Sequence, residues 1–407
     1  MPFYRKLGTV PPKRHIKHVR KENSHLDEGI YYEHVLTTEG FDRIYSIAYH
    51  MRPPTRVVGT TLLKNIELEA AEDLPLRVHH FMTAKMPRAG NFIEGRIPLM
   101  FNDDLVAYRC RPAEQQSVLF RNSGADEVIF VQQGSGVVET TYGTLPYRRG
   151  DYIVIPRTTT FQMVADDIEK EDYLILESNS PCRVPQQYVN TDGQMMLGAP
   201  YYERDLHGPT ELNPVDKNEN TSIIVKERHR LTKVEMANHP LDVVGWDGFL
   251  YPFTFNAWDF EPLTGTVHLP PPYQQTFECD GFVICTFAPR HLDHHPEAVK
   301  VPYAHSNTQA DEVLFYVEGQ FGSRKGVEAC SISFHPGGIP HGPHPGTIVG
   351  SDKHDRTEEM AVMFDTDHPL TITKEAMSMD DPQYPFCLLY TSPSPRDRTR
   401  SRMPSSA

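Results

Sequence analysis

The chain has 407 residues, near the upper range for one domain, so two domains or one elaborated domain are expected. Its 54 acidic and 40 basic residues give a formal net charge of −14, which argues against a cationic surface for nucleic acid or anionic lipid. The sequence contains no apolar run near the roughly 18 residues that cross a bilayer, and no secretory signal is indicated. Six cysteines without a CxxC pair fit reduced thiols, so we expect a cytoplasmic protein that binds neither nucleic acid nor a membrane.

The chain is predicted to be built mainly from short β-strands separated by turns. The basic stretch at 5–21 is short and interrupted by proline, and we interpret it as an arm used in packing or subunit contact. Helical periodicity is scarce, with residues 64–73 and 373–377 as the best candidates. Alternating apolar residues between Gly, Pro, Asn and Asp predict strands within 127–143, 151–156, 281–287, 312–319, 329–338 and 358–366. This pattern favours an all-β barrel or sandwich.

An internal repeat organises the chain. FRNSGADEVIFVQQGSG (120–136) aligns with HSNTQADEVLFYVEGQF (305–321), about 185 residues later, so that Asn122 falls on Asn307 and Glu127 on Glu312. Downstream, residues 150–161 parallel residues 330–341. The repeat predicts a duplicated barrel.

The repeat also suggests a division of the chain. An N-terminal β-rich domain of residues 1–235 would contain the first barrel at about 110–180, and residues 236–387 would form the second domain. The final stretch, 388–407, is rich in Ser, Pro and Arg, and we expect it to be a disordered or non-native tail.

The two copies differ in residues that bind metals. The first copy has Phe120 where the second has His305, and it has Thr160 or Phe161 where the second has His341. The first barrel is therefore expected to be free of ligand, and the second to keep a metal site.

In the second copy, His305, Glu312 and His341 supply two imidazoles and one carboxylate. Residues seven apart on a straight strand face opposite ways, so the polar stretch 306–311 must bend for His305 and Glu312 to converge. Such a set leaves about three coordination positions open, which suits ferrous iron that binds a chelating substrate and O₂, and the lack of thiolates disfavours structural zinc. His335 could be a fourth ligand, a substrate contact or a loop hydrogen bond.

The second copy resembles the cupin superfamily through HSNTQADEVLFYVEG. A closer resemblance, over about 125 residues of the C-terminal half, is to the homogentisate 1,2-dioxygenase family. The segments that carry it follow the family order and are LDVVGWDGFLYPFTFN (241–256), VHLPPP (267–272), FVICTFAPR (282–290), VPYAHSN (301–307), SFHPGGIPHGP (333–343) and EMAVMF (359–364).

The resemblance implies a mainly β, two-barrel cupin (jelly-roll) fold with a degenerate N-terminal barrel and a metal-binding C-terminal barrel. It implies that Fe(II) is bound by His305, Glu312 and His341. His268 falls on the family's acid/base histidine, and His335 and Asn307, together with His341, fall at substrate-side positions.

The activity implied is insertion of both atoms of O₂ into homogentisate to give maleylacetoacetate, in tyrosine and phenylalanine catabolism, by a homo-oligomer. The alternatives are a cupin dioxygenase for another hydroquinone-type diol such as gentisate, a manganese- or zinc-dependent isomerase, and a non-enzymatic bicupin that binds a small molecule.

Overall fold

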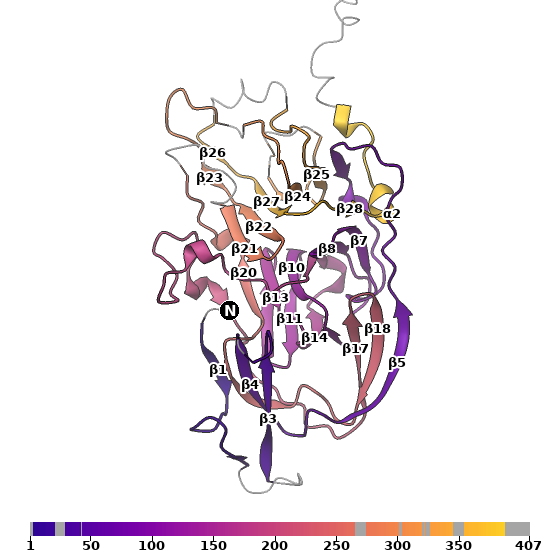
Figure 1. Ribbon diagram of the computed structural model, residues 1–407, viewed down its shortest axis with the longest axis vertical. Helices are drawn as coiled ribbons and strands as arrows, with labels where there is room; N and C mark the ends of the chain where they lie inside the picture. The colour runs from indigo at the N-terminus through magenta and orange to yellow at the C-terminus, as the bar shows by residue number, and fades with distance from the viewer. Residues whose placement is uncertain are drawn as a thin grey trace, which may run out of the picture.

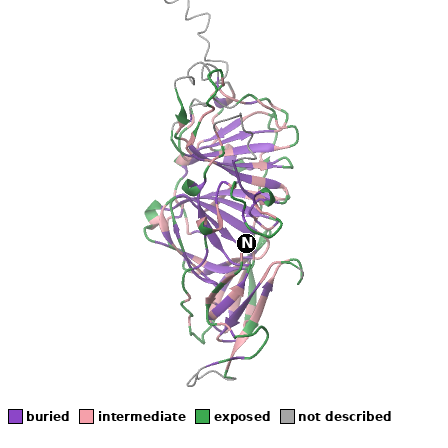
Figure 2. Cartoon of the chain, turned by 90° about the vertical axis from the view of Figure 1, so that its left-hand side faces the viewer, coloured by how far each residue is buried: buried purple, intermediate pink, exposed green. Residues whose placement is uncertain are grey.

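The computed structural model describes residues 3–20, 29–41, 43–264, 274–300, 303–319, 321, 326–344 and 354–386. Strands dominate the described chain, as the sequence predicted, and they stack in tiers along its long axis (Figure 1). Buried residues concentrate within each tier (Figure 2). None of the described helices is long and apolar enough to span a membrane. The lowest tier is a sheet in the order β1 (Arg5–Gly8), β19 (Val243–Gly248), β4 (Tyr45–His50), β3 (Ile30–Thr37) and β2 (His18–Val19).

Two sheets form the middle tier, which contains the first copy of the repeat. One has the order β16 (Leu206–His207), β20 (Phe253–Asn256), β13 (Asp151–Ile155), β10 (Asp126–Gln133), β15 (Asp172–Ser178), β8 (Leu105–Cys110), β7 (Arg96–Phe101) and β28 (Thr371–Ile372). The other has the order β12 (Gly143–Arg148), β11 (Ser135–Thr140), β14 (Thr160–Ala165), β9 (Leu119–Asn122), β17 (Thr221–Glu227), β18 (Arg230–Met236) and β5 (Val57–Asn65).

The upper tier, which contains the second copy, is a curled sheet. Its order is β21 (Gln275–Cys279), β22 (Phe282–Phe287), β27 (Met360–Thr366), β24 (Asp311–Glu318), β25 (Ile332–His335) and β6 (His79–Phe81), and a short ribbon of β23 (Arg290–His291) and β26 (Arg356–Thr357) lies beside it. The order β13-β10-β15-β8 in the first copy matches β25-β24-β27-β22 in the second. This correspondence confirms the duplication.

The register agrees with the repeat residue by residue. Glu127 of β10 lies opposite Ile155 and Glu177, and Glu312 of β24 lies opposite His335 and Asp365. In each copy, this glutamate therefore lies between a residue of one neighbouring strand in the sheet and an acidic residue of the other.

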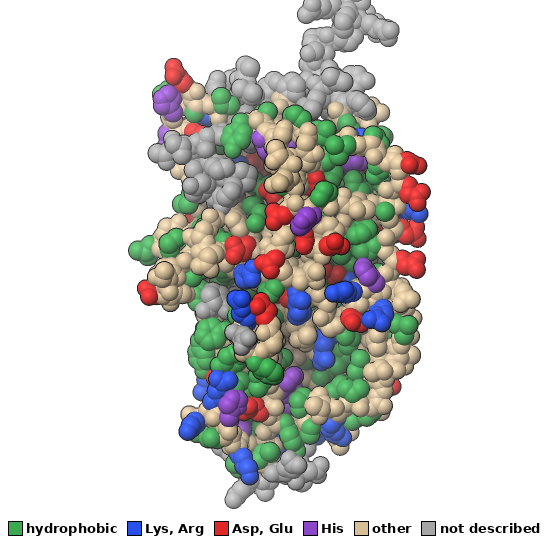
Figure 3. All heavy atoms as spheres, in the orientation of Figure 1, with side chains coloured by type: hydrophobic (Ala, Val, Ile, Leu, Met, Phe, Trp, Pro, Cys, Tyr) green, Lys and Arg blue, Asp and Glu red, His purple; other side chains and the backbone are tan. Residues whose placement is uncertain are grey.

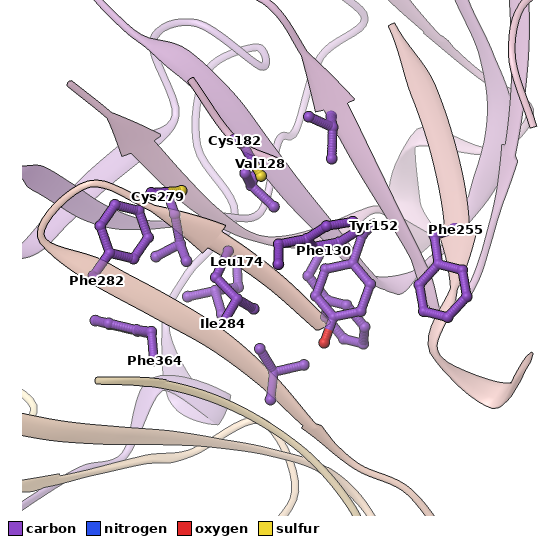
Figure 4. Close-up of a cluster of buried hydrophobic side chains, with 14 of the residues drawn as sticks. Val128, Phe130, Tyr152, Leu174, Cys182, Phe255, Cys279, Phe282, Ile284 and Phe364 are labelled. Carbon is purple, nitrogen blue, oxygen red and sulfur yellow. The ribbon is translucent and has the colours of Figure 1, made fainter. Parts of the chain in front are cut away.

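The two copies pack face to face through an apolar core. Figure 4 shows Val128, Phe130 and Leu174 of the first copy against Ile284 and other apolar side chains of the second. Each buried side chain of this size contributes about 1.5–3 kcal/mol relative to exposure. The interface also contains a tyrosine, Tyr152, whose hydroxyl lies 2.8 Å from that of Thr286, so its polar end is satisfied.

The copies also exchange strands, which the sequence did not predict. The early strand β6 pairs with β25 in the upper sheet, and the late strand β28 pairs with β7 in the middle one. The sheet of each copy is therefore completed by a strand from the opposite end of the sequence.

One helix expectation is correct and the other is wrong. Thr373 caps a short helix, α2 (Lys374–Met377), through its hydroxyl. Residues 64–73, in contrast, are not helical: the first two extend β5, and the rest run beside α2, where the Glu69 carbonyl accepts from the Lys374 amide. Tertiary pairing outweighs helix propensity here, since propensity differs by only about 0.7 kcal/mol per residue among ordinary residues.

Glu171 gives the fold a dependence on pH. Its side chain is buried, accepts from the Ser135 amide at 3.1 Å and from the Tyr173 hydroxyl, and fills the space beside Gly134 where a Cβ would stand. Burial is the main cause that raises the pKa of Glu171 to about 7, from an ordinary value of 4.5. Between these values the unfolded state releases its proton first, so stability falls as the pH rises from about 4.5 to about 7.

We expect Glu171→Gln to remove most of this fall. The shift corresponds to about 3 kcal/mol, so the variant should gain up to that much relative to wild type at pH 8 and nothing at pH 4. Urea unfolding at both pH values measures it. Equal effects of the substitution at the two pH values would contradict the assignment.

Candidate metal centre

The predicted bend between His305 and Glu312 is present in the structure. His305 precedes β24 and forms an isolated antiparallel bridge with His341, in which each backbone amide donates to the other residue's carbonyl at 2.8 Å. Glu312 is the second residue of β24, and His335 ends the neighbouring strand β25. The chain thus brings two loop histidines to the end of the sheet where Glu312 lies.

The ligand atoms converge on one point. The Nε2 atom of His305 lies 3.3 Å from Oε2 of Glu312, and the Nε2 atom of His341 lies 3.5 Å from Oε1. One ligand atom from each of these three residues lies within 4.8 Å of the others. The side chains of Glu312 and His341 are almost completely buried, whereas His305 is partly exposed.

The tautomers of the two histidines fit a metal ion. The Nδ1 atom of His305 lies 3.2 Å from the Tyr303 carbonyl, and that of His341 lies 3.0 Å from the Ile339 carbonyl. A carbonyl only accepts, so Nδ1 carries the proton and, in a neutral ring, the Nε2 lone pair faces Glu312. Nδ1–H bonded to a carbonyl is the usual support of a ligating histidine.

A proton or a metal ion between these groups would balance their charge. The Nε2 atom of His341 is buried and forms no hydrogen bond with any described residue. Two nitrogen lone pairs and a carboxylate that converge in a buried site repel one another unless a proton or a metal ion lies between them. The donor set of two imidazoles and one carboxylate matches that of a metal with open coordination positions.

His335 supports the carboxylate. Its Nδ1 atom donates to Oε1 of Glu312 at 2.7 Å, and its ring stacks on that of His341 with centroids 4.5 Å apart. Burial opposes ionisation of Glu312, but its contacts with the imidazoles of His305, His335 and His341 outweigh burial and hold its pKa well below the usual range. Glu312 is therefore ionised and ready to bind a cation.

Asp365 is a component of the site that the sequence reasoning missed. It lies opposite Glu312 on β27. Burial raises the pKa of Asp365 to about 8, and the charge of Glu312 adds to the shift. The repeat contains the signal that could have revealed it, since Glu177 occupies the equivalent position in the first copy.

The first copy shows what replaces the metal ligands. Phe120 pairs with Phe161 in the same register as His305 with His341, which resolves the alignment in favour of Phe161 over Thr160. The Arg96 guanidinium lies 2.9 Å from both carboxylate oxygens of Glu127 and 3.0 Å from Glu177. Lys226 is also ion-paired with Glu177, so two fixed side-chain cations balance the two buried carboxylates.

Of the three other predicted site residues, the structure describes Asn307 and His335. The carbonyl of Asn307 accepts from the Gly338 amide at 2.7 Å and so ties the His305 loop to the His341 loop. His335 and His341 line a cavity of about 210 Å³. His268 lies outside the described residues. The other cavity walls come from elements that the sequence reasoning did not connect with the site: Leu76, Arg77, Val78, Ile339, Pro340, Gly342, His344, Tyr384 and Pro385.

Two family models match consecutive parts of the chain. Homogentisate 1,2-dioxygenase N-terminal covers residues 99–257, and homogentisate 1,2-dioxygenase C-terminal covers residues 259–391. The chain belongs to the homogentisate 1,2-dioxygenase family. The resemblance inferred from the C-terminal motifs is thereby confirmed, and it extends over the first copy of the repeat.

Relatives of known name agree with this membership. A protein of Saccharolobus solfataricus, named provisionally as a dioxygenase without a substrate, is 37% identical over 96% of this chain and 100% of its own. Homogentisate 1,2-dioxygenase of Bradyrhizobium diazoefficiens is 24% identical over 63% of this chain and 59% of its own length. That of Legionella pneumophila is 27% identical over 70% of each chain.

Solved structures show a weaker likeness. A cupin 2 conserved barrel protein from Leptotrichia buccalis aligns with 75% of this chain and 100% of its own, at 9% identity and a TM-score of 0.32. This score supports no structural conclusion.

Membership of the homogentisate 1,2-dioxygenase family makes this protein a dioxygenase-type enzyme that acts on a small molecule and O₂.

Proposed function

We propose that this protein is a cytoplasmic, Fe(II)-dependent homogentisate 1,2-dioxygenase of tyrosine and phenylalanine catabolism. It would insert both atoms of O₂ into homogentisate and release maleylacetoacetate. The observation that carries the proposal is the convergence of two Nε2 lone pairs and one ionised carboxylate beside a cavity. Family membership supplies the reaction class.

Ferrous iron bound by His305, Glu312 and His341 would supply open positions for a chelating diol and for O₂. The task of the protein is then to hold the ligands and the ring in place. The backbone carbonyls of Tyr303 and Ile339 fix the two imidazoles, and His335 fixes the carboxylate.

His268 would accept the proton of a substrate hydroxyl. A histidine of ordinary pKa, near 6.5, is a competent base at neutral pH. His335 would contact the substrate, because it lines the cavity. Asn307 would lie on the substrate side of the site, in the His305 loop that its carbonyl ties to the His341 loop.

The cavity suits a single aromatic ring. Its volume is about 210 Å³, whereas a buried cavity of roughly 150 Å³ accommodates benzene. The difference leaves room for ring substituents such as hydroxyl groups and a short acid side chain.

The test is O₂ uptake by protein reconstituted with Fe(II) under anaerobic conditions. With homogentisate we expect one O₂ consumed per ring and the mass of maleylacetoacetate as product. Protein treated with a chelator, and protein loaded with Zn(II), serve as controls and should consume none. Uptake with gentisate but not homogentisate would contradict the substrate, and binding of either diol without uptake would favour the non-enzymatic reading.

A further inference from the structure

The cavity beside the candidate metal centre has one permanently charged side chain in its wall. His335 and His341 line it together with several apolar residues, and Arg77 is the only Lys, Arg, Asp or Glu among the described residues that do so. On the face that Figure 3 shows, Lys and Arg gather over the lower and middle tiers, and few lie over the upper tier. A positive group in the wall of this cavity is therefore a local exception in a chain with a net charge of −14.

Arg77 is held in place by residues at the start of β6 and near the end of the described chain. Its Nη2 atom donates to Oδ2 of Asp380, and its Nη1 atom donates to the Val78 carbonyl at 3.2 Å. The other oxygen of Asp380 accepts from Nδ1 of His79 at 3.2 Å, and the Asp380 backbone bridges to Phe81. The Asp380 side chain is only 4% exposed, so the group that fixes Arg77 is itself fixed.

The Arg77 guanidinium has donors left for a ligand. Only two of its five N–H groups donate to described residues. The side chain is 22% exposed, so part of it can be reached from the cavity. The planar guanidinium matches a carboxylate in shape and can bind it through two parallel hydrogen bonds.

We propose that Arg77 binds the carboxylate of an aromatic acid whose ring occupies this cavity. The inference rests on the proposed function and deepens it, because it makes the site selective for diols with an acid side chain over uncharged diols. A carboxylate that enters a largely apolar cavity needs a partner of opposite charge, and none of the described lining residues is acidic and would repel it. The alternative is a purely structural ion pair between Arg77 and Asp380, which predicts no preference between an acid and its uncharged amide.

The test is calorimetric titration of the full-length, Zn(II)-loaded protein in the absence of O₂. The two ligands are homogentisate and its uncharged amide, 2,5-dihydroxyphenylacetamide. Zinc accepts imidazole and carboxylate ligands but has no redox chemistry, so binding is measured apart from ring cleavage. We expect the wild type to bind the acid roughly 10–100-fold more tightly than the amide. Arg77→Met should lower the affinity for the acid to that for the amide, and Arg77→Lys, which keeps the charge without the planar fork, should retain part of the preference.

Arg290→Met is the matched control. It breaks another partly buried ion pair of the upper tier, formed with Glu359 at 3.0 Å, and Arg290 does not line the cavity. This variant should keep the wild-type preference, and circular dichroism establishes that each variant is folded.

Equal affinities of the wild type for acid and amide, absence of binding, or a preference that survives in Arg77→Met would overturn the proposal. O₂ uptake by the Fe(II) protein tests the proposed function separately. If ring cleavage is wrong, no diol is consumed, but the Zn(II)-loaded wild type still prefers the acid.

Discussion

Glu312→Gln is expected to lose its metal and its O₂ uptake together. The amide keeps the size of the side chain but removes the charge on which His305 and His341 converge. Loss of an outer partner of a metal ligand typically costs roughly 10–100-fold in affinity, and we expect loss of the carboxylate ligand itself to exceed that range. Metal analysis after dialysis against a weak chelator, followed by the O₂ assay, measures both effects.

The repeat provides the matched control, because Glu127→Gln makes the same change at the equivalent position of the first copy. That variant, when folded, should retain the wild-type amount of iron. Full metal content in Glu312→Gln, or an equal loss in both variants, would contradict the assignment of the site to the second copy.

Glu127→Gln should instead be costly to stability. It leaves the buried Arg96 guanidinium with only Glu177 as a charged partner. Removal of one member of a buried ion pair typically costs about 3–5 kcal/mol, and because Glu177 remains we expect the lower end of that range. Chemical unfolding measures the loss in free energy.

The double variant R96M/E127L distinguishes an uncompensated charge from simple loss of contacts. Apolar replacement of a whole buried ion pair is often neutral, so it should cost less than Glu127→Gln alone. Equal destabilisation by the single and double variants would show that Arg96 does not need Glu127 for charge balance.

The site was predictable where the repeat supplied an internal comparison. Alignment of the copies set Glu312 against Glu127 and His335 against Ile155, and the sheet register agrees at both positions. The convergence of His305 and His341 was predicted, whereas their backbone pairing, and its counterpart between Phe120 and Phe161 in the first copy, became visible only in the structure.

What the sequence could not predict depends on contacts between distant segments. Arg96 is basic and lies outside the repeat, and nothing local indicates that its side chain enters the first copy. Residues 64–73 have helical periodicity, but their partner, the segment around Thr373, lies about 300 residues away. The exchange of β6 and β28 could not be predicted from periodicity either, because both strands are too short to show a period.

The pairing of β6 with β25 sets an order of events during synthesis. Phe81 and its partner Ile332 lie about 250 residues apart, so the sheet that bears the metal ligands cannot close until most of the chain has left the ribosome. At roughly 5–20 residues per second, β6 waits on the order of ten seconds or more for its partner. A metal ion held by His305, Glu312 and His341 would therefore enter only after residue 341 has been made, and a chain that stalls before residue 332 would lack both β25 and His341.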